Sequence, residues 1–150
     1  MNAAGTFAAV GFALFVAHSV GDHWVQTSAQ SAAKGRPGWS GRLAGARHVA
    51  TLTATKVVVL LPVAWLLGLH LSVPGLLVGL GVDAVTHWWA DRRTTLAWLA
   101  GRVGLDGFYR LGAPRPGRDD NPSLGTGAYA LDQSWHHLWL LVAALLIAVV

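Results

Sequence analysis

The chain has 150 residues, of which 53% are hydrophobic and only 12% are charged, and its mean hydropathy is +0.46. About 25% of the residues of a typical soluble domain are charged, so this composition favours a membrane protein. The absence of cysteine excludes disulfides, thiolate zinc sites, iron–sulfur clusters and cysteine nucleophiles. The net charge of +4 reflects a shortage of acids rather than a basic tail, so we expect no nucleic-acid partner.

Four apolar segments predict four membrane-spanning helices. They cover residues 3–25, 49–69, 74–91 and 131–150. Each is close to the roughly 20 residues that a helix needs to cross about 30 Å of hydrocarbon. We expect Lys56, near the start of the second segment, to extend its amine to the near interface, and Pro62 to kink the middle of that segment.

The connections between these segments differ in character. Residues 26–47 are polar and rich in glycine and serine, which predicts a loop. Residues 94–111 alternate apolar and polar side chains and predict an interfacial helix, and the proline- and glycine-rich stretch 112–126 predicts a loop. The expected fold is therefore all-α, a single-domain integral membrane four-helix bundle with an interfacial helix between spans three and four. A soluble helical bundle is the alternative, since its buried helices would be equally apolar.

Apart from Lys56, all lysine and arginine residues lie in two of the connections. They are Lys34, Arg36, Arg42 and Arg47 after the first segment, and Arg92, Arg93, Arg102, Arg110, Arg115 and Arg118 after the third. Because basic loops stay in the cytoplasm, we expect a multi-pass protein of the bacterial cytoplasmic membrane with both termini outside. Membrane lipid, including anionic head groups, is the expected partner. Gly75-x-x-x-Gly79 allows close helix approach, either within the chain, which we favour, or in a homo-oligomer.

Histidine and aspartate recur at steps of four residues inside the apolar segments. The sets are His18, Asp22 and Gln26 in the first segment, Asp83, His87 and Asp91 in the third, and Asp132 and His136 in the fourth. Side chains four residues apart stack on one face of a helix, so each set forms a polar stripe. With the topology above, the stripes and His48 all fall in the cytoplasmic half of the bilayer, where they can meet, with Asp83 deepest.

Such a meeting has two main chemical interpretations. The groups can form a structural hydrogen-bond network, or neutral imidazoles and carboxylates can bind a divalent metal ion, with zinc as the candidate. The favoured ligands are His18, Asp22, His87 and His136. Asp83 is either a further ligand or a partner of His87, Asp132 orients His136, and these two carboxylates are the candidate catalytic groups.

A metal ion at this depth predicts a hydrolase acting near the cytoplasmic leaflet, on a substrate that the residues do not identify. The alternative is a non-catalytic membrane module for assembly, partner binding or ion passage. Ion passage is disfavoured because the outer half of each segment lacks ionisable groups before His70 at the far interface.

The motifs also resemble those of known families. His18-x-x-x-Asp22-x-x-x-Gln26, an isolated His48, Asp83-x-x-x-His87 and Asp132-Gln133-x-x-His136 together resemble a family of small polytopic membrane proteins of bacteria and their phages whose function is unknown. This resemblance covers nearly the whole chain and implies a multi-helix membrane fold. The His and Asp spacing is also similar to that of membrane-embedded zinc hydrolases such as alkaline ceramidases, which add a serine, for which Ser19 and Ser134 are candidates.

Overall fold

The computed structural model describes residues 2–115, 117 and 125–150, and within these ranges the chain is helical and contains no strand. The elements are α1 Ala3–Val20, the π-helix η1 Gly21–Val25, α2 Ser28–Ala33, α3 Gly38–Leu67, α4 Val73–Asp91, α5 Thr94–Arg102, α6 Asp106–Tyr109 and α7 Gly127–Val149. The prediction of an all-α fold is confirmed.

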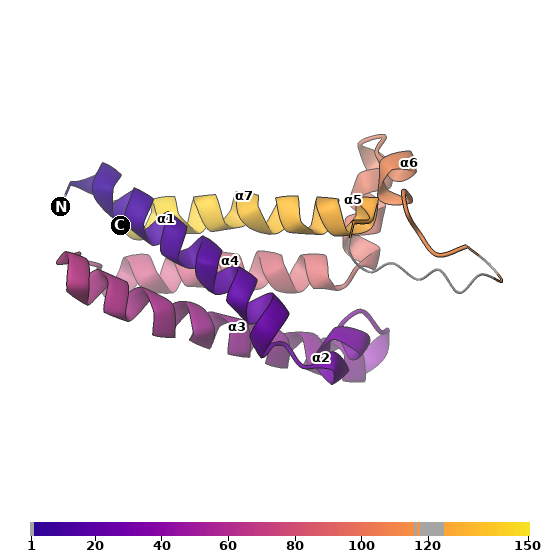
Figure 1. Cartoon of the computed structure of the whole chain (residues 1–150), viewed down its shortest axis with the longest axis horizontal. Helices are drawn as coiled ribbons and strands as arrows, with labels where there is room; N and C mark the ends of the chain where they lie inside the picture. The colour runs from indigo at the N-terminus through magenta and orange to yellow at the C-terminus, as the bar shows by residue number, and fades with distance from the viewer. Residues whose placement is uncertain (1, 116, 118–124) are drawn as a thin grey trace.

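Four long helices lie side by side along the long axis of the molecule (Figure 1). Helices α1 and α4 lie diagonally across the bundle, and each packs on both α3 and α7. Both termini and the α3–α4 link lie at one end of the bundle, whereas α2, α5 and α6 lie at the other (Figure 1). The long helices therefore run alternately up and down, as the four apolar segments predict.

The helix ends follow the local sequence. Asn2, Thr27, Ser72 and Thr126 accept backbone N–H groups as N-caps of α1, α2, α4 and α7. Gly68 ends α3 with the left-handed backbone that favours glycine (φ 61°). With Thr126 as its cap, α7 begins at Gly127, four residues before the predicted segment 131–150. The predicted segment was bounded by its apolar residues, whereas the helix begins at its capping residue.

The prediction of a loop at residues 26–47 is wrong for most of that stretch. Thr27 and Gln30 form a capping box that starts α2, and α3 begins directly after Pro37. Basic residues mark where a segment leaves the apolar medium, but a helix continues into water as long as its backbone bonds are satisfied. Helix α3 therefore has 30 residues and runs through Pro62 without interruption.

The single interfacial helix predicted at residues 94–111 is divided in two. Helix α5 ends at Arg102, Gly104 adopts a left-handed backbone (φ 78°), and α6 follows from Asp106. The predicted loop at 112–126 lies partly outside the described residues; its described positions contain no helix.

Helices α4 and α7 pack closely against each other. A Cβ atom on Gly79 would stand 2.7 Å from the carbonyl oxygen of Ala143 and 2.6 Å from Ile147 Cγ1, and one on Gly75 would stand 3.3 Å from the Ile147 carbonyl oxygen. The two glycines therefore let the backbones approach within the chain, as favoured from the sequence. Beside them, small and branched apolar residues fill the core, among them Val10, Leu14, Leu60 and Ala143.

The outer faces of the bundle carry many exposed apolar side chains. They include Phe12, Val58, Trp65, Leu77, Val85 and Leu138. Two helical stretches, Ala3–Val25 and Gly38–Leu67, are long and apolar enough to cross a membrane.

Candidate metal centre

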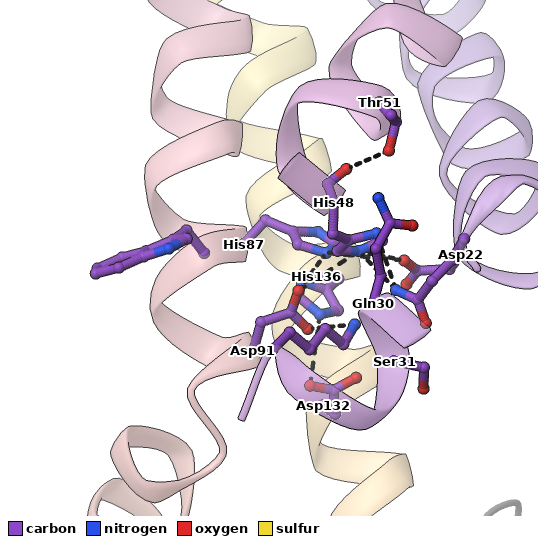
Figure 2. A network of polar contacts seen from close by, with 12 residues as sticks. Asp22, Gln30, Ser31, His48, Thr51, His87, Asp91, Asp132 and His136 are labelled. Atoms are coloured by element: carbon purple, nitrogen blue, oxygen red, sulfur yellow. Dashed lines mark hydrogen bonds and ion pairs between the residues drawn. The ribbon is translucent and has the colours of Figure 1, made fainter. Parts of the chain in front are cut away.

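Histidine and aspartate side chains from all four long helices converge in the half of the bundle next to α2 and α5 (Figure 2). His18, His48, His87 and His136 are all buried, with at most 2% of each residue exposed. Because buried imidazoles and carboxylates are costly without partners, the contacts among them decide what the cluster can do.

The π-helix η1 places Asp22 in this cluster. It continues α1 directly, and a Cβ atom on Gly21 would stand only 2.2 Å from Leu52 Cδ1 on α3. Single π-turns inside α-helices often occur at functional sites because they redirect side chains. Here the turn brings Asp22 Oδ1 to 3.0 Å from His48 Nε2.

Three ligand-type atoms form a nearly equilateral triangle. His48 Nε2 lies 3.2 Å from His87 Nε2 and 3.4 Å from Asp91 Oδ2, and His87 Nε2 lies 3.3 Å from the same Asp91 oxygen. A tetrahedral zinc site with bonds of about 2.0–2.1 Å has edges of about 3.3–3.4 Å. The triangle thus has the dimensions of one face of a zinc coordination tetrahedron. Asp22 Oδ1 lies beside it, 3.0 Å from His48 Nε2 and 3.8 Å from His87 Nε2.

Hydrogen bonds alone do not satisfy this arrangement. His48 Nε2 also lies 3.0 Å from Gln26 Nε2, so one ring nitrogen has four polar neighbours but carries only one hydrogen or lone pair. Asp22 Oδ1 and Asp91 Oδ2 are buried and lack a well-aligned hydrogen bond among the described residues, although both lie close to His48. A single cation would satisfy these atoms together, so the residues present fit a divalent metal ion.

A second part of the cluster is formed by α7. The His136 ring stacks on the His87 ring with centroids 3.9 Å apart, and His136 Nε2 lies 3.5 Å from Asp132 Oδ1. Among the described residues, three overlapping sets offer ligand atoms within 4.8 Å of one another. They are Asp22, His87 and His136; His48, His87 and Asp91; and Asp91, Asp132 and His136.

Of the four predicted ligands, Asp22, His87 and His136 are brought together, whereas His18 lies beside them. Its ring centroid is 5.0 Å from that of His136 and 5.4 Å from that of His87. His18 Nε2 is 3.5 Å from Asp22 Oδ2, and both His18 nitrogens lack a hydrogen-bond partner among the described residues. His18 is therefore in contact with the cluster but belongs to none of the three sets.

Asp83, predicted as a ligand or a partner of His87, is engaged elsewhere. Its Oδ2 accepts a hydrogen bond of 2.5 Å from Lys56 Nζ, and both residues are buried. The expectation that Lys56 reaches the interface is wrong, because the ion pair with Asp83 satisfies the ammonium inside the bundle. Asp132, the other candidate catalytic residue, lies at the cluster with 28% of its side chain exposed.

Three residues of the centre lie outside the predicted set of ligands: Asp91, His48 and Lys34. The sequence indicates that Asp91 and His48 can take part, because Asp91 belongs to the polar stripe of the third segment and His48 lies at the level of the stripes. Lys34 carried no such signal, because it belongs to a stretch predicted as a loop. Its ammonium lies 2.7 Å from Asp91 Oδ1.

Helix α2 holds Lys34 against the cluster. Arg92 donates hydrogen bonds to the carbonyl oxygens of Lys34 and Arg36, and Arg93 donates one to that of Ser31. These arginines therefore tie the end of α2 to the end of α4, which also stabilises the negative end of the α2 dipole.

The charge of Asp132 acts on Tyr109 of α6. Burial, followed by the negative charge of Asp132, raises the pKa of Tyr109 above its ordinary value. Ser134, a candidate for a catalytic serine, is exposed and donates to the Leu131 carbonyl oxygen. The carbonyl oxygen of Ser19, the other candidate, contacts His23 Nδ1 at the exposed surface.

Comparisons with protein-family models, with curated proteins and with solved structures found no match for this chain. The family resemblance drawn from the motifs stays a prediction.

Proposed function

We propose that the protein is a four-span integral membrane protein that binds one divalent metal ion and uses it for hydrolysis near the cytoplasmic leaflet. One observation carries the proposal: the buried triangle of His48 Nε2, His87 Nε2 and Asp91 Oδ2, with sides of 3.2, 3.4 and 3.3 Å.

The charges of the cluster suit one divalent cation. Asp22, Asp91 and Asp132 contribute three negative charges and Lys34 one positive charge, which leaves two negative charges when the histidines are neutral. Asp83 and Lys56 neutralise each other. One divalent ion therefore balances the centre, and a low-dielectric interior strongly favours that balance.

The distribution of side chains supports four spans. Helices α4 and α7 carry Asp83, His87, Asp91, Asp132 and His136, which lower their hydropathy; all of them except Asp132 are buried in the interior. Lysine and arginine lie just after α2, in the first part of α3, after α4 and in α5, at one end of the bundle, and the end with the termini has none (Figure 1). This asymmetry supports a cytoplasmic location for the end that carries α2 and α5.

A divalent cation supplies Lewis acidity, which polarises a carbonyl or phosphoryl oxygen and makes water a better nucleophile at neutral pH. His48, His87, Asp91 and Asp22 would hold it. Asp132 is the exposed carboxylate at the cluster and acts as the general base that accepts a proton from water. Buried Lys34 neutralises part of the carboxylate charge.

Metal content tests this proposal directly. We expect the purified protein to bind one zinc ion per chain by elemental analysis and calorimetry, and His48→Ala to lose it. His70→Ala is the matched control, because His70 is exposed and lies at the opposite end of the bundle. Equal metal content in the two variants, or none in the wild type, contradicts the proposal.

A second measurement separates catalysis from a structural role. Asp132→Asn should abolish hydrolysis while metal is retained, whereas Asp106→Asn, at an exposed ion pair with Arg110, should change neither. In the alternative, a structural network without a metal ion, Lys34 alone neutralises Asp91. This alternative predicts that a chelator leaves the melting temperature unchanged. We expect the chelator to lower it, because an ion bound only by the folded state stabilises that state.

A further inference from the structure

An apolar groove runs along the seam between α3 and α4. It has a volume of about 490 Å³, and its walls include Thr53, Val57 and Leu61 of α3 and Leu77, Gly81 and Ala84 of α4. Leu61, Leu77 and Gly81 are exposed, so the groove opens on the outer surface of the bundle. A volume of this size is typical of ligand pockets, and nearly all of its lining is apolar.

The groove and the candidate metal centre occupy the same seam. His48 belongs to α3 and His87 and Asp91 to α4. Ala84 precedes His87 by three residues and Thr53 follows His48 by five, which correspond to about 4.5 and 7.5 Å along the helix axes. The groove therefore ends about one helical turn from the triangle and extends from it toward the bundle end that carries the termini.

We propose that this groove holds the acyl chain of a membrane lipid ester or amide, and that the acyl carbonyl is the group hydrolysed at the metal centre. This inference rests on the proposed function. A lipid of the cytoplasmic leaflet has its head group at the basic end of the bundle and its chain toward the midplane, which is the direction of the groove.

The position of the groove selects the carbonyl over the phosphate. The acyl carbonyl is the first polar group beyond the chain, so a chain that fills the groove places it level with His48 and His87. A lipid phosphate lies several bonds farther toward the basic end. The charge count agrees, since a centre balanced by one divalent ion offers no surplus positive charge to a phosphodiester anion.

The reaction balances with water as the only co-reactant. A water oxygen bonds to the acyl carbon, and the bond from that carbon to the ester oxygen or amide nitrogen breaks. The departing oxygen or nitrogen takes up a proton and leaves as an alcohol or amine, and the fatty acid leaves as a carboxylate with its proton passed to Asp132 and then to solvent. No oxidant or reductant takes part.

Occupancy of the groove is tested without relying on catalysis. The protein is reconstituted with phosphatidylglycerol that carries a photoreactive diazirine in its acyl chain, and adducts are mapped by mass spectrometry. We expect adducts concentrated on residues 53–61 and 73–84, and a several-fold loss in Gly81→Leu. A Cβ atom on Gly81, which lines the groove, meets no atom within 4 Å, so the leucine side chain begins in open space. Gly101→Leu on α5 is the matched control, because Gly101 is equally unobstructed.

Adducts spread evenly over outward-facing residues such as Phe12 and Leu141, or cross-links from the groove to a second protein chain, overturn the proposal.

Dependence of the rate on acyl-chain length tests the reaction. Metal-loaded wild type should hydrolyse p-nitrophenyl laurate in preference to the butyrate, and Gly81→Leu should lose only the laurate activity. Release of phosphate without fatty acid overturns the carbonyl assignment. A chain that binds no metal but keeps its groove adducts refutes the proposed function and removes the catalytic part of this inference, while lipid binding stands.

Discussion

Lys56 and Asp83 show how a single charge is accommodated in an apolar bundle. Asp83 lies one helical turn from His87, yet its carboxylate is directed to Lys56 on the neighbouring helix, and the ammonium has no exposed surface. Removing one partner of a buried ion pair leaves an uncompensated charge, whereas replacing both by apolar residues of similar size is often neutral. The pair joins α3 to α4 across the seam that contains the groove.

For this pair we expect a marked difference between single and double substitutions. Lys56→Met should lower the free energy of unfolding by about 3–5 kcal/mol, and Lys56→Met combined with Asp83→Leu should recover most of the loss. Arg110→Met, which breaks an exposed pair with Asp106, should cost less than about 1 kcal/mol. Denaturant unfolding in detergent micelles measures all three, and a double variant no more stable than Lys56→Met alone would refute the argument.

The site histidines differ in what secures them. His48 is fixed by contacts from four directions, whereas His18 reaches the cluster only through ring contacts and a long approach to Asp22. The spacing of four residues predicts that His18 and Asp22 lie on one face of a regular helix. The π-turn at η1 instead directs Asp22 toward His48. Sequence spacing assumes a regular α-helix, and one extra backbone unit in a turn is enough to change which residues meet.

At the scale of elements, α4 has two different glycine-bearing faces. Gly79 faces the backbone of α7, and Gly81, two residues on, faces the open groove. A helix places residues two apart on different faces, so the same substitution has opposite consequences at the two positions.

Accordingly, we expect Gly79→Ala to reduce stability by about 1–3 kcal/mol, because the added methyl forces α4 away from the Ala143 carbonyl oxygen. Gly81→Ala should be neutral or stabilising by up to about 1 kcal/mol, because alanine favours the helix and meets no neighbour. Thermal unfolding in detergent compares the two variants. Equal effects at both positions would show that α4 and α7 are not packed as described.

Across the whole molecule, charge and chemistry are divided between the two ends. Helices α2 and α5 and the basic residues beside them lie at the end nearer to the candidate metal centre, while the core of the other half of the bundle is apolar (Figure 1). A membrane with its cytoplasmic face at the basic end would place the centre within reach of that leaflet.

Cysteine labelling tests this orientation cleanly, because the natural chain contains no cysteine. In intact bacterial cells, a membrane-impermeant maleimide should label the thiol of His70→Cys and leave that of Ser40→Cys unlabelled until the cells are lysed. Both positions are exposed, at opposite ends of the bundle. The reverse pattern would place the metal centre at the outer leaflet, and labelling of both thiols would contradict a chain that spans the membrane between them.

The helical class, the apolar segments and the half of the bundle in which histidine and aspartate gather follow from the sequence, because these depend on composition and helical periodicity along single segments. Which atoms meet depends on the packed fold: His48 and Asp91 in the triangle, Lys34 on Asp91, Asp83 on Lys56, and His18 to one side. Partner choice among equally spaced polar groups depends on helix rotation, on the π-turn at η1 and on the close contact at Gly79. Each of these arises from packing between segments distant in the chain, which no local pattern encodes.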